Sequence, residues 1–179
     1  MFHVTQNLLL RPAWPEDADA LFGGIADEGI VRNLARAPWP YLPHHAHDYV
    51  SVEKDPRLPS FLLTLPSEHG SRLVGCAGLG EGADGVELGY WIARPFWGRG
   101  YATEAARGVL EVARMLGHER ISAGHFTDNP ASGRVLRKVG FTPTGRTVSR
   151  HSCGRGGDAD CVMYTLDLGD QDSERQVAA

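Results

Sequence analysis

Cysteine is scarce in this chain, with only three among 179 residues. Cys76, Cys153 and Cys161 are an odd number, and their spacings fit neither a disulfide framework nor a zinc site. We therefore expect free thiols. Cys76 falls within an expected strand, where a buried and inert thiol is favoured over a reactive one.

Runs of like charge are also missing. The net charge of −4 arises from 18 Lys and Arg residues and 22 Asp and Glu residues that are interspersed along the chain. Such a pattern gives no electrostatic footprint for nucleic acid or for an anionic membrane surface. We expect neither of them as a partner.

No apolar stretch is long enough to span a membrane, and the first residues, Met1–Asn7, turn polar at once instead of forming a signal peptide. The protein is therefore expected to be cytoplasmic. Hydrophobic residues make up 42% of the chain, which is enough for a buried core. We expect one domain over residues 1–168 and a disordered tail over residues 169–179.

The hydrophobic pattern alternates between the periods of strands and helices, which is typical of an α/β protein. Strands are expected at Gln6–Arg11, Phe61–Leu65, Arg72–Leu79, Val86–Ala93, Arg120–Phe126, Phe141–Arg150 and Cys161–Leu168. Helices are expected at Ala18–Ala26, His44–Lys54, Thr103–Leu116 and Ala131–Val139. The second, third and fourth strands should form an antiparallel meander, with turns at Ser67–Gly70 and Gly80–Gly85.

The most informative segment is Gly98–Ala106, which follows the apolar strand Val86–Ala93. Gly98 and Gly100 let the backbone bend, and the unpaired N–H groups of the first helical turn then point outward. A strand, a tight turn and a helix start in this order make an anion site, for which phosphate is the obvious ligand. Two glycines at such a junction also fit an ordinary turn.

A second glycine-rich segment, Gly80–Gly85, follows a strand and literally matches the dinucleotide-binding pattern. That pattern requires a helix next, whose N-terminus takes the pyrophosphate, whereas Val86–Ala93 has the composition and length of a strand. We interpret Gly80–Gly85 as a flexible hairpin loop. A nucleotide-binding module remains the weaker alternative.

Three blocks of the sequence, in the same order, resemble the GCN5-related N-acetyltransferase (GNAT) superfamily, and within it the ribosomal-protein N-terminal acetyltransferases. The blocks are Glu87–Trp91, Trp97–Ala105 and Asn129–Phe141. The resemblance covers nearly the whole chain. It implies a mixed, mostly antiparallel sheet of about seven strands flanked by helices. It also implies a splayed strand pair that binds the pantetheine arm of acetyl-coenzyme A (acetyl-CoA), the acetyl donor.

The resemblance also implies which residues bind this donor. The superfamily's phosphate-binding pattern usually starts with Arg or Gln, and Trp97 stands at that place here. Since main-chain N–H groups do most of the binding, this change need not abolish it. Asn129, followed by proline, fits a helix N-cap as well. The implied cofactor-binding residues are Trp91, Ile92, Gly98, Arg99, Gly100, Tyr101, Ala102, Thr103, Asn129, Ser132 and Arg134.

Acyl transfer to an amine needs an unprotonated nucleophile, a polarised thioester carbonyl and a proton for the leaving thiolate. Glu87 stands where many relatives keep a catalytic carboxylate, so the resemblance implies that it is the base. The alternation of its strand also fits a solvated, outward-facing Glu87. We expect direct attack in a ternary complex and not a covalent enzyme intermediate, and no candidate nucleophile contradicts this expectation.

The Tyr that many superfamily members use to protonate the thiolate is replaced by Leu136. In the branch resembled here, a Ser falls at the position of Ser132 and is thought to meet the coenzyme sulfur, to which it can donate a hydrogen bond. Alternatively, Ser132 serves only the local backbone of a helix start. The missing Tyr also keeps open a non-catalytic protein that binds or senses acyl-CoA.

Residues 30–55 cover the acceptor site in the family resembled. Trp39, Tyr41 and Tyr49, together with Glu87, are therefore expected to bind the acceptor, either a small-molecule amine or a protein N-terminus. Core packing is the alternative for Trp39 and Tyr49. An exposed sheet edge would allow a homodimer, as in relatives.

Three histidines lie in the same region. His44, His45 and His47 lack the spacing of a helical zinc site, and no cysteine is near them in the sequence. We therefore expect no metal.

Overall fold

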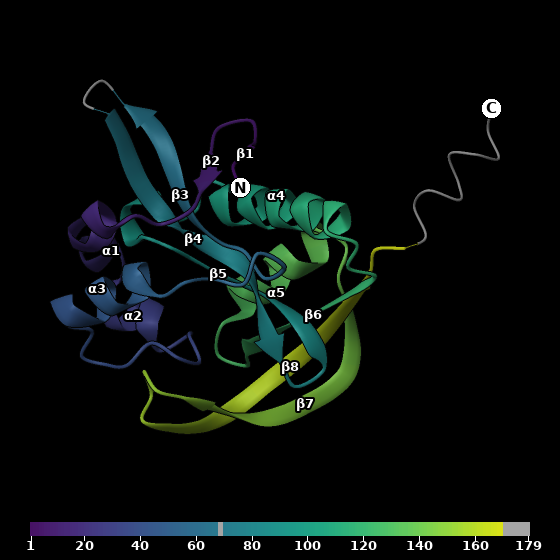
Figure 1. Ribbon diagram of the computed structural model, residues 1–179. Coiled ribbons are helices and arrows are strands. Elements are labelled where there is room, and N and C mark those ends of the chain that lie inside the picture. Colours follow the sequence, from purple (N-terminus) through teal and green to yellow (C-terminus); the bar gives the residue numbers. More distant parts are fainter. Residues whose placement is uncertain (68–69, 170–179) are drawn as a thin grey trace, which may run out of the picture.

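The computed structural model describes residues 1–67 and 70–169 and shows a mixed α/β fold (Figure 1). Its sheet, within these ranges, has eight strands in the order β1-β2-β3-β4-β5-β6-β8-β7. The strands are β1 (His3–Val4), β2 (Leu9–Arg11), β3 (Ser60–Ser67), β4 (Gly70–Gly82), β5 (Gly85–Ile92), β6 (Arg120–Phe126), β7 (Thr142–Ser152) and β8 (Gly157–Asp167). The expected turn residues Glu68 and His69, and the expected tail beyond Gly169, lie outside the described residues.

The helices cover both faces of the sheet (Figure 1). None of those described is both long and apolar enough to cross a membrane. The helices are η1 (Pro15–Asp17), α1 (Ala18–Ile25), α2 (Glu28–Val31), α3 (Pro43–Ser51), η2 (Arg94–Phe96), α4 (Tyr101–Met115) and α5 (Pro130–Lys138).

The alternation of side chains along the strands places the two larger clusters of the core on opposite faces of the sheet. Leu63 of β3 packs in the cluster that contains the buried residues of α4, together with Leu136 of α5. Its neighbour Leu62 packs in the other cluster, with residues of α1, α2 and α3. The central strands are therefore apolar on both faces, and this explains why their sequences read as nearly continuous hydrophobic runs.

The splayed strand pair expected from the family resemblance is present. β5 and β6 run parallel and pair at a single position, Glu87 with Ser122. The Ser122 hydroxyl donates to the Val86 carbonyl at 3.0 Å, which fixes the two strands at this point. The remainder of β5 pairs only with β4 among the described strands, so the sheet opens between β5 and β6.

The structure corrects two details of the expected fold. Among the described residues the sheet has eight strands where about seven were expected, because a short strand at the N-terminus, His3–Val4, pairs with β2. The loop expected at Gly80–Gly85 is shorter, since β4 continues to Gly82 and β5 starts at Gly85. A strand, and not a helix, follows this turn, so it lacks the structural context of a dinucleotide-binding fingerprint.

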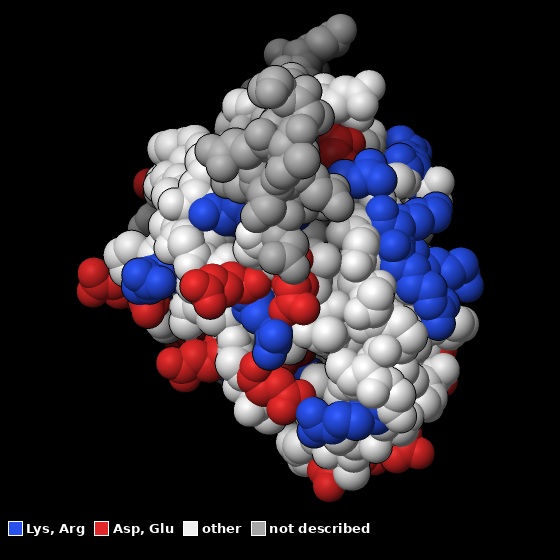
Figure 2. Space-filling model, turned by 90° about the vertical axis from the view of Figure 1, so that its right-hand side faces the viewer, with Lys and Arg blue, Asp and Glu red and all other residues white. Residues whose placement is uncertain are grey.

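Charges that are interspersed along the sequence are less evenly distributed on the surface. In the view of Figure 2, most of the Lys and Arg side chains lie along one side, while Asp and Glu predominate elsewhere. Sequence order alone does not determine such a distribution, because the fold brings distant segments together.

Candidate active site

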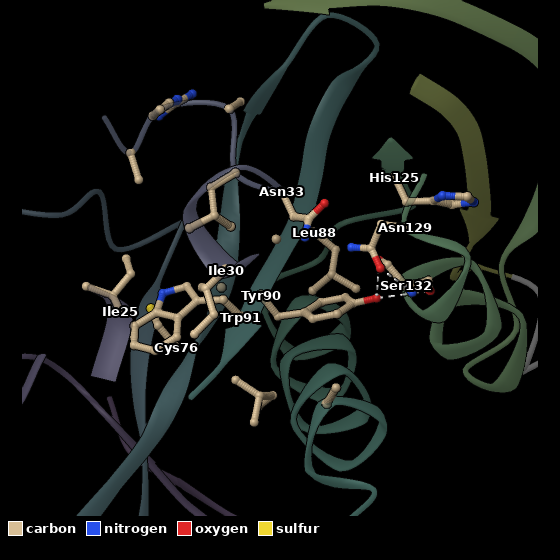
Figure 3. A pocket seen from close by; sticks show the side chains of 18 of the residues that line it. Ile25, Ile30, Asn33, Cys76, Leu88, Tyr90, Trp91, His125, Asn129 and Ser132 are labelled. Carbon is tan, nitrogen blue, oxygen red and sulfur yellow. Dashed lines mark hydrogen bonds between the residues drawn. The ribbon is translucent and has the colours of Figure 1, made fainter. Parts of the chain in front are cut away.

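A cavity of about 990 Å³ lies where β5 and β6 separate, and it reaches both faces of the sheet. On one face it is lined by the start of α4 and by α5. On the other face it is lined by α1, α3 and the segment that joins α2 to α3. Figure 3 shows part of this lining, with the Tyr90 side chain directed toward α5.

The glycine turn before α4 has the geometry of an anion cradle. Gly98 and Gly100 have φ values of 75° and 85°, in the left-handed region that favours glycine. Gly100 is the N-cap of α4, so the N–H groups of Tyr101, Ala102 and Thr103 precede the first helical hydrogen bond. Within the described ranges these three groups have no acceptor. They can therefore bind an anion, which the helix dipole also favours.

Trp97, which stands in place of the usual Arg or Gln, has a structural role in the cradle. Its indole N–H donates to the carbonyl of Ile92, the last residue of β5, at 2.6 Å. The Arg94 guanidinium lies 4.6 Å from the centre of its ring and forms an ion pair with Asp27. Trp97 thus ties the glycine turn to the end of β5.

The expected N-cap at α5 is confirmed. The Asn129 side chain accepts a hydrogen bond from the backbone N–H of Ser132 at 3.4 Å, and Pro130 occupies the first helical position. Arg134 and Lys138, one helical turn apart, both line the cavity. Two cations thus line the same cavity as the free N–H groups of α4.

The Ser132 hydroxyl lies 2.8 Å from the phenolic oxygen of Tyr90, a residue that the sequence analysis did not select (Figure 3). Tyr90 also donates to the Ser132 carbonyl at 3.2 Å. Burial raises the pKa of Tyr90 to about 12, although the bond to Ser132 acts in the opposite direction. The alternation of β5 is the signal that could have identified Tyr90, since it falls on the same face as the buried Leu88.

Glu87 lies on the other face of β5, at the point where the strands begin to separate. Its two carboxylate oxygens accept hydrogen bonds from Arg150 of β7 at 2.5 Å and 2.9 Å. The Glu87 side chain is 14% exposed, so it is not a freely solvated position. The hydrogen bonds to Glu87 raise the pKa of Arg150, which keeps the guanidinium charged.

Tyr41 and Tyr49 line the cavity on the side of α3, whereas Trp39 does not. Trp39 is 41% exposed and borders a separate depression. The Tyr49 hydroxyl lies 2.5 Å from Ser60 Oγ and 3.0 Å from Cys76 Sγ. Burial raises the pKa of both Tyr49 and Cys76. Cys76 is thus a buried free thiol, as expected.

The other cofactor-binding residues expected from the sequence mostly reach the same cavity. The exception is Arg99, whose guanidinium lies 5.8 Å from the centre of the Phe96 ring. The expected residues that line the cavity are Trp91, Ile92, Gly98, Gly100, Tyr101, Ala102, Thr103, Asn129, Ser132 and Arg134.

Of the three histidines on α3, only His45 lines the cavity. Its Nδ1 accepts a hydrogen bond from the Leu42 N–H at 3.0 Å, so it caps the helix. In the part of the chain that the structure describes, no three His, Cys, Asp or Glu side chains come together as a metal-binding group.

Residues 7–142 match the family model described as an acetyltransferase (GNAT) domain. The chain belongs to this family. A Bacillus subtilis relative, the uncharacterized N-acetyltransferase YoaA, is 28% identical over 177 residues, which span 90% of this chain and 94% of the relative. The family model and such relatives support an acetyltransferase.

Solved structures share the fold of this GNAT acetyltransferase. A GNAT-family acetyltransferase from Bacillus anthracis has a TM-score of 0.79 and 21% identity, and the match covers 93% of this chain and 98% of that one. RimL, a ribosomal L7/L12 alpha-N-protein acetyltransferase solved with coenzyme A, has a TM-score of 0.76 and 18% identity, with 94% and 98% covered. At these identities the likeness shows the fold alone.

In this acetyltransferase, the position of the usual thiolate-protonating Tyr faces the core. Leu136 is 1% exposed and packs among the buried residues of α4 and the sheet. A phenol that acts there would have to come from another element. Tyr90 of β5 is such a group, because its hydroxyl reaches Ser132 on α5.

Proposed function

We propose that this acetyltransferase moves the acetyl group of acetyl-CoA to a primary amine by direct attack in a ternary complex. One observation carries the proposal. A single cavity joins an anion cradle on one face of the sheet to a compartment lined by Glu87, Tyr41 and Tyr49 on the other. Donor and acceptor can therefore meet where β5 and β6 separate.

The donor fits the side of α4 and α5. The free N–H groups of Tyr101, Ala102 and Thr103 would bind its diphosphate, with Arg134 and Lys138 adding positive charge. The pantetheine arm, which carries amide groups, would lie along the edge of β5 that has no strand partner after Glu87. Such an edge can bind an extended ligand through its main chain.

The two proton transfers of the reaction would be carried out by two side chains. The amine nitrogen attacks the acetyl carbonyl carbon, the carbon–sulfur bond breaks, and its electron pair goes to sulfur. Glu87 would accept the proton that the amine loses, since each of its oxygens keeps a second lone pair beside the bond to Arg150. Ser132 would donate to the leaving sulfur.

The acceptor would enter from the side of α3. Tyr41 and Tyr49 line this compartment with aromatic surface, and Glu87 would attract the positive charge of an amine. A small-molecule amine and a protein N-terminus both meet these requirements. Trp39 lies away from the cavity, so we do not include it among the acceptor-binding residues.

Isothermal titration of acetyl-CoA into the parent and into a Gly100→Trp variant tests the donor site. The indole would fill the cradle, and binding should be lost. Gly145→Trp is the matched control, because Gly145 has a similar φ of 77° and lies on β7, outside the cavity lining. Parent protein that does not bind acetyl-CoA would refute the proposal. Binding without acetylation of any amine in a broad screen would favour the non-catalytic acyl-CoA sensor instead.

A further inference from the structure

Two hydroxyl groups from distant parts of the chain meet in the cavity wall. Tyr90 extends from β5 toward the first turn of α5, and its oxygen lies 2.8 Å from Ser132 Oγ and 3.2 Å from the Ser132 carbonyl oxygen (Figure 3). Both residues line the cavity. The pair therefore lies on the side of the cavity that α4 and α5 line.

The protons of this pair have two arrangements. A hydroxyl donates one hydrogen bond and accepts others, whereas the carbonyl only accepts. In the first arrangement Tyr90 donates to the Ser132 carbonyl and accepts the proton of the Ser132 hydroxyl. In the second, Tyr90 donates to Ser132 Oγ, and the Ser132 proton is free to point into the cavity. Only the second arrangement lets Ser132 donate to a ligand.

We propose that Tyr90 is a positioning residue for thiolate protonation: it turns the Ser132 hydroxyl toward the leaving sulfur and replaces the proton that Ser132 gives up. This inference rests on the proposed acetyl transfer. As the carbon–sulfur bond breaks, sulfur receives the Ser132 proton and Ser132 receives the Tyr90 proton. The tyrosinate then regains a proton from water, and the amine proton, which leaves through Glu87, neutralises the hydroxide that this step produces. Atoms and charges balance without a further reactant.

The environment of Tyr90 suits this role. An aliphatic hydroxyl alone is a weak acid, so Ser132 benefits from a phenol behind it. Burial raises the pKa of Tyr90 to about 12, and the phenol is thus fully protonated near neutral pH. Leu136, which occupies the position of the usual phenol, is 1% exposed within the core. The Tyr90 hydroxyl reaches the site from β5 instead.

The test is a double-mutant cycle of Tyr90→Phe and Ser132→Ala, with kcat measured by thiol release. Each single variant should lower kcat roughly 10-fold to 100-fold, and the double variant should lose no more than about threefold beyond Ser132→Ala, because the hydroxyls act as a unit. The acetyl-CoA Kd should stay unchanged. Tyr164→Phe is the control, since it removes a neighbouring buried phenol that bonds His125 and not Ser132.

Two further measurements separate this inference from the proposed function. Coenzyme A, titrated between pH 7 and pH 9.5, should bind tighter as its thiol ionises, and Tyr90→Phe should weaken this gain while Tyr164→Phe should not. This readout needs no amine. Incorporation of 3-fluorotyrosine at position 90 keeps the hydroxyl and should preserve kcat, even if Tyr90→Phe folds poorly.

The outcomes are distinct. Normal turnover in Tyr90→Phe, or losses that multiply with those of Ser132→Ala, would overturn the role of Tyr90 and leave the proposed function standing. Parent protein that binds coenzyme A and acetylates no amine would overturn the proposed function, while the thiolate titration would still decide whether Tyr90 acts on the sulfur. Failure to bind coenzyme A would overturn both.

Discussion

Both oxygens of the Glu87 carboxylate accept hydrogen bonds from the guanidinium of Arg150, which lies 63 residues further along the chain. The two side chains are 14% and 30% exposed, so water screens their attraction only in part. Glu87 follows Val86, whose carbonyl bonds Ser122 at the last contact of β5 with β6. Arg150 therefore holds a carboxylate in place where the sheet opens.

This pair leads to the first prediction. Glu87→Gln should lower kcat about 100-fold or more, because the amide cannot accept the amine proton. Arg150→Gln should lower kcat/KM about 10-fold, because the carboxylate loses both bonds that orient it. Steady-state thiol release at saturating acetyl-CoA, over a range of amine concentrations below and above KM, measures both effects.

Arg120→Gln is the matched control for Arg150→Gln. Arg120 also bonds a carboxylate, that of Asp167, but the two side chains are 71% and 56% exposed. Water screens such a surface pair, and its loss should leave turnover within about twofold of the parent. Equal losses in the two arginine variants would contradict a specific role for Arg150.

The second prediction concerns the donor phosphates. Arg134 lines the cavity on α5, so Arg134→Gln should raise the KM for acetyl-CoA about 10-fold or more through the loss of a charged hydrogen bond, with little change in kcat. The effect should shrink at high salt. Arg137 lies on the same helix but not in the cavity lining, and Arg137→Gln should leave this KM unchanged. An unchanged KM in Arg134→Gln would exclude it from the phosphate site.

The sequence was sufficient for the parts of the site that depend on local geometry. The left-handed glycines Gly98 and Gly100 and the N-cap Asn129 act over one helical turn, and the structure has the turn and the cap as predicted. The apolar run Val86–Ala93 also predicted strand β5 to within one residue at each end. Signals of this kind are contained in a few consecutive residues.

The long-range contacts that complete the site could not be predicted from the sequence. Tyr90 meets Ser132 across 42 residues, and Glu87 meets Arg150 across 63. The first contact depends on how α5 packs against the sheet. The second depends on strand order, because β8 inserts between β6 and β7 and so determines where Arg150 lies. No local periodicity encodes that order. The prediction that Trp39 binds the acceptor was made without knowledge of the chain path, because the prolines around Trp39 interrupt any periodic pattern. In the structure Trp39 borders a separate depression.

The third prediction concerns a buried ion pair that the sequence analysis did not anticipate. Arg11 and Asp17 are 6% and 12% exposed, and two hydrogen bonds of 2.7 Å and 2.6 Å join them. Asp17→Asn leaves the Arg11 charge without its partner, so the free energy of unfolding should fall by about 3 to 5 kcal/mol at neutral pH. Urea titration measures it, with the exposed Asp19→Asn as control.

The pH dependence of this loss has a definite sign. Burial acts to raise the pKa of Asp17, but hydrogen bonds from Arg11 and Trp14 outweigh it and hold the pKa below its usual value of 3.8. A lowered pKa in the folded state stabilises the protein above the unfolded-state pKa, and the gain is lost as the pH falls through the folded-state value. The difference between parent and Asp17→Asn should thus be constant from pH 7 to about pH 5 and shrink below about pH 4. A difference that widens in acid would contradict this assignment.

The fourth prediction links stability to the cradle through Glu104, in the first turn of α4. Its carboxylate accepts hydrogen bonds from Thr5 Oγ1 at 2.6 Å, from the Asn7 N–H at 2.6 Å and from the Leu8 N–H at 3.2 Å. Burial acts to raise the pKa of Glu104, but these bonds outweigh it and lower the pKa from 4.5. The stabilisation is therefore present at neutral pH and fades as the pH falls below about 4.5.

Glu104→Gln should accordingly reduce the free energy of unfolding by about 1 to 3 kcal/mol at pH 7, because hydrogen bonds to a charged group are replaced by weaker ones. It should also weaken acetyl-CoA binding, since the same helical turn supplies the N–H groups of the cradle. Glu111→Gln is the control on the same helix, where the carboxylate is 60% exposed and bonds only His3 among the described residues. Urea unfolding and titration calorimetry on the two variants measure both effects. If Glu104→Gln lost stability but bound acetyl-CoA as tightly as Glu111→Gln, the first turn of α4 would not hold the donor.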